Sequence, residues 1–167
     1  PIICSKNNVE RLTGACIYNR KSMPAKLDTK LNPIVDDALP FAASLQLAVG
    51  QASDKGHKSQ NEDAIGIRIP SGVALMTKGI VSVISDGVST AEGGAQASAI
   101  SVSNFLADYY STPESWSVQT SSAKVLSALN RWLYGLGQDY RDARRGFVCT
   151  FSALVFKSCT VHMLHVG

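Results

Sequence analysis

The sequence has few charged residues and no concentrated block of basic ones. Charged residues make up 17% of the 167 residues, below the typical share of about a quarter, whereas apolar residues make up 45%. This balance excludes an intrinsically disordered chain and predicts a globular domain with a sizeable core. A net charge of +3 without a Lys or Arg block leaves no footprint for a polyanion. We therefore expect no nucleic-acid partner.

Long apolar runs and paired cysteines are also missing. The most apolar early stretch, Ala38 to Val49, is short, is interrupted by Pro40 and has no basic flank, so we expect neither a membrane span nor a signal peptide there. The four cysteines show no CxxC spacing, which argues against a zinc site and a disulfide framework. Buried thiols in a reducing compartment are the expected state, and the cytoplasm is the expected location.

Residues 1–40 show no sustained periodicity and contain breakers such as Pro24 and Pro40. We expect this segment to be a leader or a loosely ordered segment. Met23 is a candidate for the native start, in which case residues 1–22 are not native. Residues 41–167 are expected to form the folded part.

From residue 45 onward the pattern predicts three strands, two helices and two further strands. Alternation predicts strands over 45–49 and 64–69, and a β-branched run predicts a buried strand over 80–86. Apolar residues at intervals of three and four predict one helix over 94–110 and a second that starts at Thr120 or Ser121. The apolar runs 147–156 and 160–166 indicate a hairpin. This order is typical of an α+β fold with an antiparallel sheet and helices packed on a face.

Three carboxylates lie where these strands begin and end. Asp86 ends the buried strand and is followed by Gly87, a position suited to holding a metal ion, although an ordinary Asp-Gly turn is the competing interpretation. Glu62 and Asp63 precede the strand over 64–69, where exposed turn residues are equally common. Two like charges about 4 Å apart cost about 4 kcal/mol at an effective dielectric of about 20, so converging carboxylates require cations. Hard oxygen ligands favour Mg²⁺ or Mn²⁺ over zinc.

Five short motifs follow one another in an order that resembles a known family. They are Ser53–Lys58, Asn61–Asp63, Ser85–Gly87, Gly146–Thr150 and His165–Gly167. Together they look like the protein phosphatase type 2C family of metal-dependent Ser/Thr phosphatases. The stretch 116–133 is similar to the bacterial branch in which such a domain precedes a protein kinase domain. No single motif is specific, and the resemblance rests on their order and spacing.

The resemblance implies a four-layer αββα sandwich of two antiparallel sheets flanked by helices, with a binuclear metal centre at one end. By position, Asp86 resembles the carboxylate that bridges two Mn²⁺ or Mg²⁺ ions, and Gly87 the residue whose carbonyl binds one of them. Glu62 and Asp63 resemble the acidic pair that holds metal-bound waters. The implied activity is hydrolysis of phosphoserine or phosphothreonine in a phosphoprotein by a metal-activated water. A kinase domain in the same polypeptide is a further implied partner.

Two substitutions depart from the family pattern. Lys58 stands where many members have an arginine that binds the substrate phosphate, and lysine lacks the bidentate fork. Val88 stands where some members have a histidine proposed as general acid. Protonation of the leaving group then falls to a metal-bound water or to another group, with His57 as one candidate. His162 and His165 are expected to be structural.

A third departure is the end of the chain at Gly167, where the family continues with an Asp-Ser pair and further metal carboxylates. We therefore expect residues 41–167 to be the N-terminal portion of a type 2C phosphatase domain. This piece alone should bind metal weakly and hydrolyse phosphate poorly, and Mn²⁺-dependent turnover of p-nitrophenyl phosphate at a full domain's rate would contradict that. The competing hypothesis is a non-catalytic, phosphatase-like module with a regulatory or interaction role.

Overall fold

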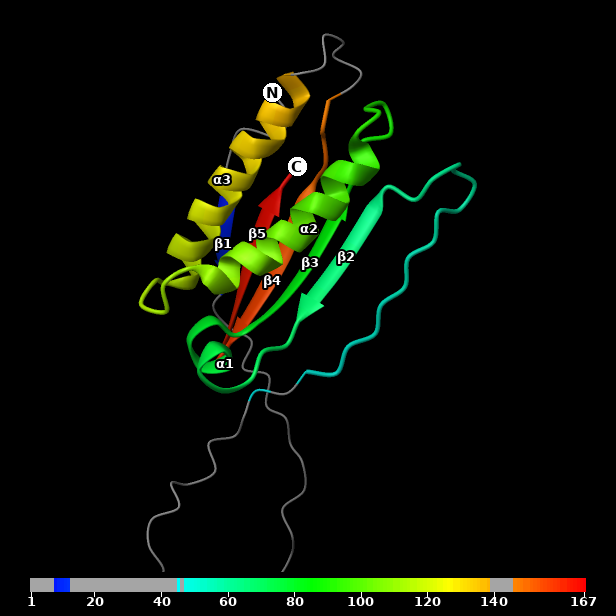
Figure 1. Cartoon of the computed structure of the whole chain (residues 1–167). Coiled ribbons are helices and arrows are strands. Elements are labelled where there is room, and N and C mark those ends of the chain that lie inside the picture. The colour runs from blue at the N-terminus through cyan, green and yellow to red at the C-terminus, as the bar shows by residue number, and fades with distance from the viewer. Residues whose placement is uncertain (1–7, 13–44, 46, 139–145) are drawn as a thin grey trace, which may run out of the picture.

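The computed structural model describes residues 8–12, 45, 47–138 and 146–167. Figure 1 shows how these residues are arranged. The elements follow one another as β1 (Asn8–Leu12), β2 (Asp63–Arg68), α1 (Gly72–Lys78), β3 (Ile80–Asp86), α2 (Gly94–Ser111), α3 (Val118–Gln138), β4 (Phe151–Lys157) and β5 (Thr160–Val166). The predicted mixture of helices and an antiparallel sheet is confirmed.

The strands form one antiparallel sheet in the order β1-β5-β4-β3-β2. β1 lies within residues 1–40, where the sequence predicts no element. The predicted hairpin is β4 and β5, which pair from Phe151 opposite Val166 to Lys157 opposite Thr160. Its turn includes Ser158, whose φ of 53° lies in the left-handed region. β4 begins at Phe151, later than predicted, and Cys149 makes only an isolated bridge to Gly87.

The helices α2 and α3 lie side by side over one face of the sheet, as Figure 1 shows. α2 approaches β2 closely because Gly66 has no side chain. A Cβ at that position would lie 2.4 Å from Cγ1 of Val102 and 2.8 Å from Cδ1 of Leu106. A glycine within a strand often marks such a close approach, and here it sets the separation between the helix layer and the sheet.

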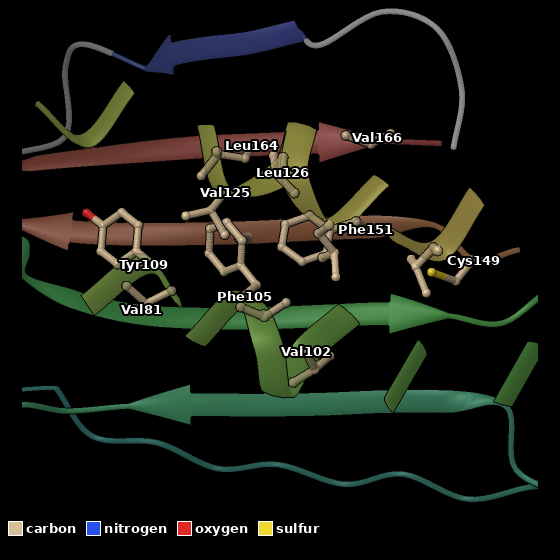
Figure 2. Close-up of a cluster of buried hydrophobic side chains, with 14 of the residues drawn as sticks. Val81, Val102, Phe105, Tyr109, Val125, Leu126, Cys149, Phe151, Leu164 and Val166 are labelled. Atoms are coloured by element: carbon tan, nitrogen blue, oxygen red, sulfur yellow. The ribbon is translucent and has the colours of Figure 1, made fainter. Parts of the chain in front are cut away.

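The hydrophobic core lies between the helices and this covered face (Figure 2). Phe105 of α2 is fully buried, with its ring centroid 4.8 Å from that of Phe151 and 5.7 Å from that of Tyr109. Alternate strand residues point into the same layer, as a period of two requires. The strand residues that belong to this buried cluster are Val81, Val83, Phe151, Ala153, Val155, Leu164 and Val166.

The opposite face of the sheet is apolar but is not buried to the same extent. Its row of Ile65, Ile84 and Ser152 is fixed by the strand register, and Ile84 is 53% exposed. Ile67, Leu154 and Met163 continue this face and are half-buried. We call it the open face. The described residues contain one sheet, so the second sheet of the expected sandwich stays a prediction.

Two predictions about the elements are wrong. Residues 45 and 47–49 are in no strand, although their sequence alternates. An alternating segment becomes a strand only where it pairs with a sheet edge, and Figure 1 shows this segment passing outside β2 without joining the sheet. α3 begins earlier than predicted because the Ser117 hydroxyl accepts a 3.0 Å hydrogen bond from the Thr120 N–H and so caps the helix.

The helix α1 was not predicted, because seven residues are too few to reveal a helical period. Gly79 closes it with a φ of 79°, and its N–H bonds to the carbonyls of Ala74 and Leu75. The helices of the described ranges do not combine the length and apolar character needed to cross a bilayer.

Candidate functional site

The antiparallel pairing of β2 and β3 brings two of the predicted metal ligands together. Asp63, the first residue of β2, lies directly opposite Asp86, the last residue of β3. Both belong to the open face, since they continue the rows of Ile65 and Ile84. Partial desolvation raises the pKa of Asp86, and a hydrogen bond with Asp63 and the charge of Asp63 raise it further. A cation between the two carboxylates would relieve this repulsion.

Lys58, Glu62 and Ser89 form a second group beside this pair. Lys58 Nζ donates to Glu62 Oε2 at 3.0 Å and to Ser89 Oγ at 3.1 Å, and Ser89 Oγ in turn donates to Glu62 Oε2. The hydrogen bond from Ser89, and then that from Lys58, lowers the pKa of Glu62. The hydrogen bond to Glu62 raises the pKa of Lys58, and the charges of Asp86 and Asp63 act in the same direction. The four sequence-predicted side chains therefore share one electrostatic environment.

The orientation of Lys58 leaves part of it accessible. Its side chain is 55% exposed, whereas that of Glu62 is 15% exposed. An ammonium group has three donors, and two of them contact Glu62 and Ser89. Lys58 can therefore present a donor to an anion without leaving the group.

Backbone contacts hold the segment around Glu62 against the end of β3. The Gly87 N–H donates to the Glu62 carbonyl at 3.0 Å, and Ser98 Oγ of α2 donates to the same oxygen at 2.5 Å. A Cβ at Gly87 would lie 2.3 Å from the Gly94 carbonyl oxygen. Only glycine fits there. Close packing at the site therefore explains why a glycine follows Asp86.

The polar loop before β2 is ordered by its own side chains. Asp54 Oδ1 accepts from the Gly56 N–H at 2.7 Å, and Gly56 has a φ of 59°. Asn61 Nδ2 donates to Ser53 Oγ at 2.8 Å, and Asn61 Oδ1 accepts from the Asp63 N–H at 3.1 Å. These bonds fix the path of the chain that carries Lys58 and Glu62. His57 lies exposed in this loop.

The carboxylate oxygens at the site are of the kind that binds a divalent cation, but they are too few to complete its coordination shell. Carboxylate oxygens of Asp63 and Asp86 suit Mg²⁺ or Mn²⁺. Glu62, the third carboxylate of the predicted set, is paired with Lys58. Across residues 8–12, 45, 47–138 and 146–167, no group of three or more His, Cys, Asp or Glu residues is arranged to hold a metal ion. Asp63 and Asp86 could therefore supply only part of a coordination shell.

Three contacts at the site were not predicted from the sequence. Ser89 joins Lys58 to Glu62, as described above. Thr150 holds Asp86 on both sides, since its N–H donates to the Asp86 carbonyl at 2.8 Å and its Oγ1 accepts from the Asp86 N–H at 3.2 Å. His165 Nδ1 lies 2.9 Å from Ser152 Oγ. The sequence signal for Thr150 and His165 was their place in two of the five motifs, whereas Ser89 had none beyond following Asp86-Gly87.

The five motifs and the geometry of the site both bear on which protein family the chain resembles. No protein-family model matches the sequence, and comparisons with curated proteins and with solved structures find no match.

Proposed function

We propose that this chain takes part in metal-dependent dephosphorylation of phosphoserine and phosphothreonine in proteins, as a phosphatase domain of the type 2C kind. One observation carries the proposal. The register of β2 and β3 sets Asp63 opposite Asp86, and Lys58 lies within their field. Lys58, Asp63 and Asp86, which come from three separate motifs, thus lie together at one end of the sheet.

Each residue of the site has a distinct task in this proposal. Asp86 and Asp63 hold the divalent cations, with the Gly87 carbonyl as a further oxygen ligand. Lys58 attracts and orients the substrate phosphate as a point charge, since lysine cannot form a bidentate fork. Glu62 sets the position of Lys58 and lies next to the cation site. The cations, Mn²⁺ or Mg²⁺, would lower the pKa of water and neutralise phosphate charge.

The open face supports the four-layer αββα sandwich. A sheet face that carries Ile65, Ile67, Ile84 and Leu154 is typical of a surface that packs on a second sheet. A second sheet there would enclose the end of β3 in a cleft and exclude water around Asp86. The free thiols of Cys149 and Cys159 suit the cytoplasm as the location, and a kinase domain is the proposed neighbour in the same polypeptide.

A non-catalytic module is the second candidate, and the pairing of Lys58 with Glu62 favours it. Each of these side chains satisfies the other without a metal or a phosphate. In such a module the carboxylate end of β2 and β3 would be a polar surface for a partner protein. The two candidates differ in one property, which is whether divalent cations support hydrolysis.

The test is hydrolysis of a phosphothreonine peptide by the native polypeptide, as its gene encodes it, with and without Mn²⁺. We expect Mn²⁺-dependent release of phosphate that Asp86→Asn abolishes. Asp108→Asn is the matched control, because Asp108 is exposed on α2 and takes no part in the site. Absence of hydrolysis by the unmodified protein would favour the non-catalytic module, and unchanged hydrolysis by Asp86→Asn would remove the metal role of Asp86.

A further inference from the structure

Lys58 and Glu62 bind each other, although each has a separate task in the proposed function. Lys58 Nζ donates to Glu62 Oε2 at 3.0 Å, and Ser89 Oγ donates to the same carboxylate oxygen. Lys58 Nζ also donates to Ser89 Oγ at 3.1 Å. The three side chains therefore form a closed ring of hydrogen bonds, which we call the Lys58 cluster.

The Lys58 cluster keeps a third carboxylate away from the candidate cation site. Desolvation and Asp63 raise the pKa of Asp86 most, and the charge of Glu62 adds to the rise, so Glu62 lies within electrostatic reach of the pair. An ammonium group and a divalent cation repel each other and compete for the same carboxylate oxygens. Glu62 can therefore join Asp63 and Asp86 around a cation only after Lys58 releases it.

The contact between Lys58 and Glu62 is easily exchanged for another. The Lys58 side chain is 55% exposed, so water and dissolved anions reach its ammonium group. A phosphate monoester carries about two negative charges near neutral pH and three acceptor oxygens, more than a carboxylate offers. The backbone carbonyl of Glu62 stays bound to the Gly87 N–H and to Ser98 Oγ. The exchange therefore needs side chains to rotate and leaves the backbone in place.

We infer that phosphate displaces Glu62 from Lys58, and that the released Glu62 strengthens cation binding at Asp63 and Asp86. This inference rests on the proposed phosphatase function and concerns how its two ligands depend on each other. Without phosphate, Lys58 holds Glu62, and cations bind less tightly. With phosphate on Lys58, the third carboxylate is available to a cation. Coupling between binding sites is reciprocal, so the cation strengthens phosphate binding by the same factor.

This coupling regulates the site by the presence of its own substrate. A phosphorylated side chain that reaches Lys58 raises the affinity for cations at the moment when they are needed. When phosphate leaves, Lys58 binds Glu62 again, and the affinity for cations falls. The site therefore holds its cations more tightly with a phosphoprotein than without one.

A double-mutant cycle on Mn²⁺ binding tests the inference without turnover. The affinity of the native polypeptide is measured from the electron paramagnetic resonance of free Mn²⁺, with no phosphate present. Lys58→Met should raise the affinity by about fivefold where Glu62 is present, the upper end for an exposed ion pair. In the Glu62→Gln background the same substitution should have a smaller effect, because only the general field of the lysine remains. Lys55→Met, in the same exposed loop, is the control for lost charge.

Failure of this inference is distinguishable from failure of the proposed function. An equal rise in both backgrounds would show that Lys58 acts through its charge alone, and no rise in either would show that it does not compete with the cation. Either result would overturn the inference, while Mn²⁺-dependent hydrolysis by the unmodified protein would still support the phosphatase. Absence of Mn²⁺ uptake in the unmodified protein and in every variant would remove the metal-dependent function itself. Unchanged thermal midpoints show that the variants retain the fold.

A second readout needs no metal. In the ¹³C-labelled protein, addition of inorganic phosphate should shift the Cδ resonance of Glu62, because its carboxylate loses the ammonium group. The Cδ resonance of Glu114, which is exposed in the connection between α2 and α3, should stay in place. Lys58→Met should abolish the shift at Glu62. A Glu62 resonance that does not move in the unmodified protein would contradict displacement by phosphate.

Discussion

The two faces of the sheet have similar apolar content but opposite surroundings. On the covered face, Val83 and Phe151 are almost completely buried beneath α2 and α3. On the open face, Ile84, the neighbour of Val83 in the same strand, is 53% exposed. Strand sequence alone does not distinguish these environments, because both sets of residues are apolar. The difference arises from which face the two helices can reach.

The comparison also separates stability from chemistry. The covered face carries the aromatic packing around Phe105, whereas Asp63, Asp86 and His165 all lie on the open face. In the described residues the aromatic packing therefore lies on one face, and the residues of the candidate site lie on the other. Substitutions on the covered face should mainly change stability, and substitutions at the candidate site on the open face should mainly change binding or activity.

The largest effect on stability is expected from Phe105→Ala, on the covered face. Phe105 is fully buried between Tyr109 and Phe151, so its removal should cost about 3–5 kcal/mol of unfolding free energy. Denaturant unfolding would measure this loss. Tyr134→Ala is the control, because Tyr134 is 49% exposed on α3 and its removal should have a small effect. Similar losses in the two variants would contradict the assignment of the core.

A smaller effect is expected from Lys78→Met at the edge of the core. Lys78 is 2% exposed, and its Nζ donates to Thr112 Oγ1, the Pro113 carbonyl and Ser121 Oγ at 2.6, 2.7 and 3.2 Å. Its removal leaves these oxygens short of a donor, at a cost of about 1–3 kcal/mol near neutral pH. Denaturant unfolding would detect it, and a stability equal to the unmodified protein's would show that methionine packing offsets the lost bonds.

The pH dependence of this difference has a definite sign. Burial lowers the pKa of Lys78, and repulsion by Lys157 lowers it further, against an opposing effect of Glu114. Between the lowered pKa and the ordinary value of 10.5, the unfolded chain binds more protons than the folded one. The unmodified protein therefore gains stability as pH rises through this window, and Lys78→Met lacks this gain. The stability difference between the two proteins should therefore grow as pH rises, and a difference that stays constant or shrinks would contradict a lowered pKa of Lys78.

Ser89→Ala should act on the open-face chemistry and leave stability unchanged. Loss of its hydroxyl removes one of the two contacts that position Lys58, and the hydrogen bond from Lys58 to Glu62 remains. One hydrogen bond of about 1 kcal/mol corresponds to about a fivefold rise in KM for a phosphopeptide. Ser89→Thr should restore KM, and Thr90→Ala, at the exposed neighbouring position, is the control. A fall in kcat with an unchanged KM would place Ser89 in another role.

The smallest effect is expected from Ile84→Thr in the 167-residue chain. Because Ile84 is half-exposed on the open face, the unfolding free energy should change by less than about 0.5 kcal/mol. A loss comparable to that from a core residue would show that this face is covered in solution, and it would weaken the contrast between the two faces.

The fold was predictable where the periodicity was long or the strand was buried. The β-branched run of β3 and the apolar stripe of α2 are confirmed almost to the residue. The prediction failed where pairing with a strand distant in the sequence decides whether a segment becomes a strand. Residues 47–49 alternate like a strand but pair with no edge, and β1 pairs with β5 from a segment that has no strand pattern.

The candidate site was predictable to the extent that motifs carry it. The structure brings together Lys58, Glu62, Asp63 and Asp86, although their roles stay proposals. Ser89 and His165 could not be assigned from the sequence, because the contacts that define them cross 27 residues to Glu62 and 13 residues to Ser152. Such contacts follow from strand register and loop packing, which periodicity does not encode.

The most direct measurement is Mn²⁺ binding by the native polypeptide, followed by the electron paramagnetic resonance signal of free Mn²⁺. The account predicts that the unmodified protein takes up Mn²⁺, that Asp86→Asn loses most of this uptake, and that Asp108→Asn retains it. Equal Mn²⁺ uptake by the unmodified protein and Asp86→Asn, or no uptake by either, would contradict a metal centre at the end of β3.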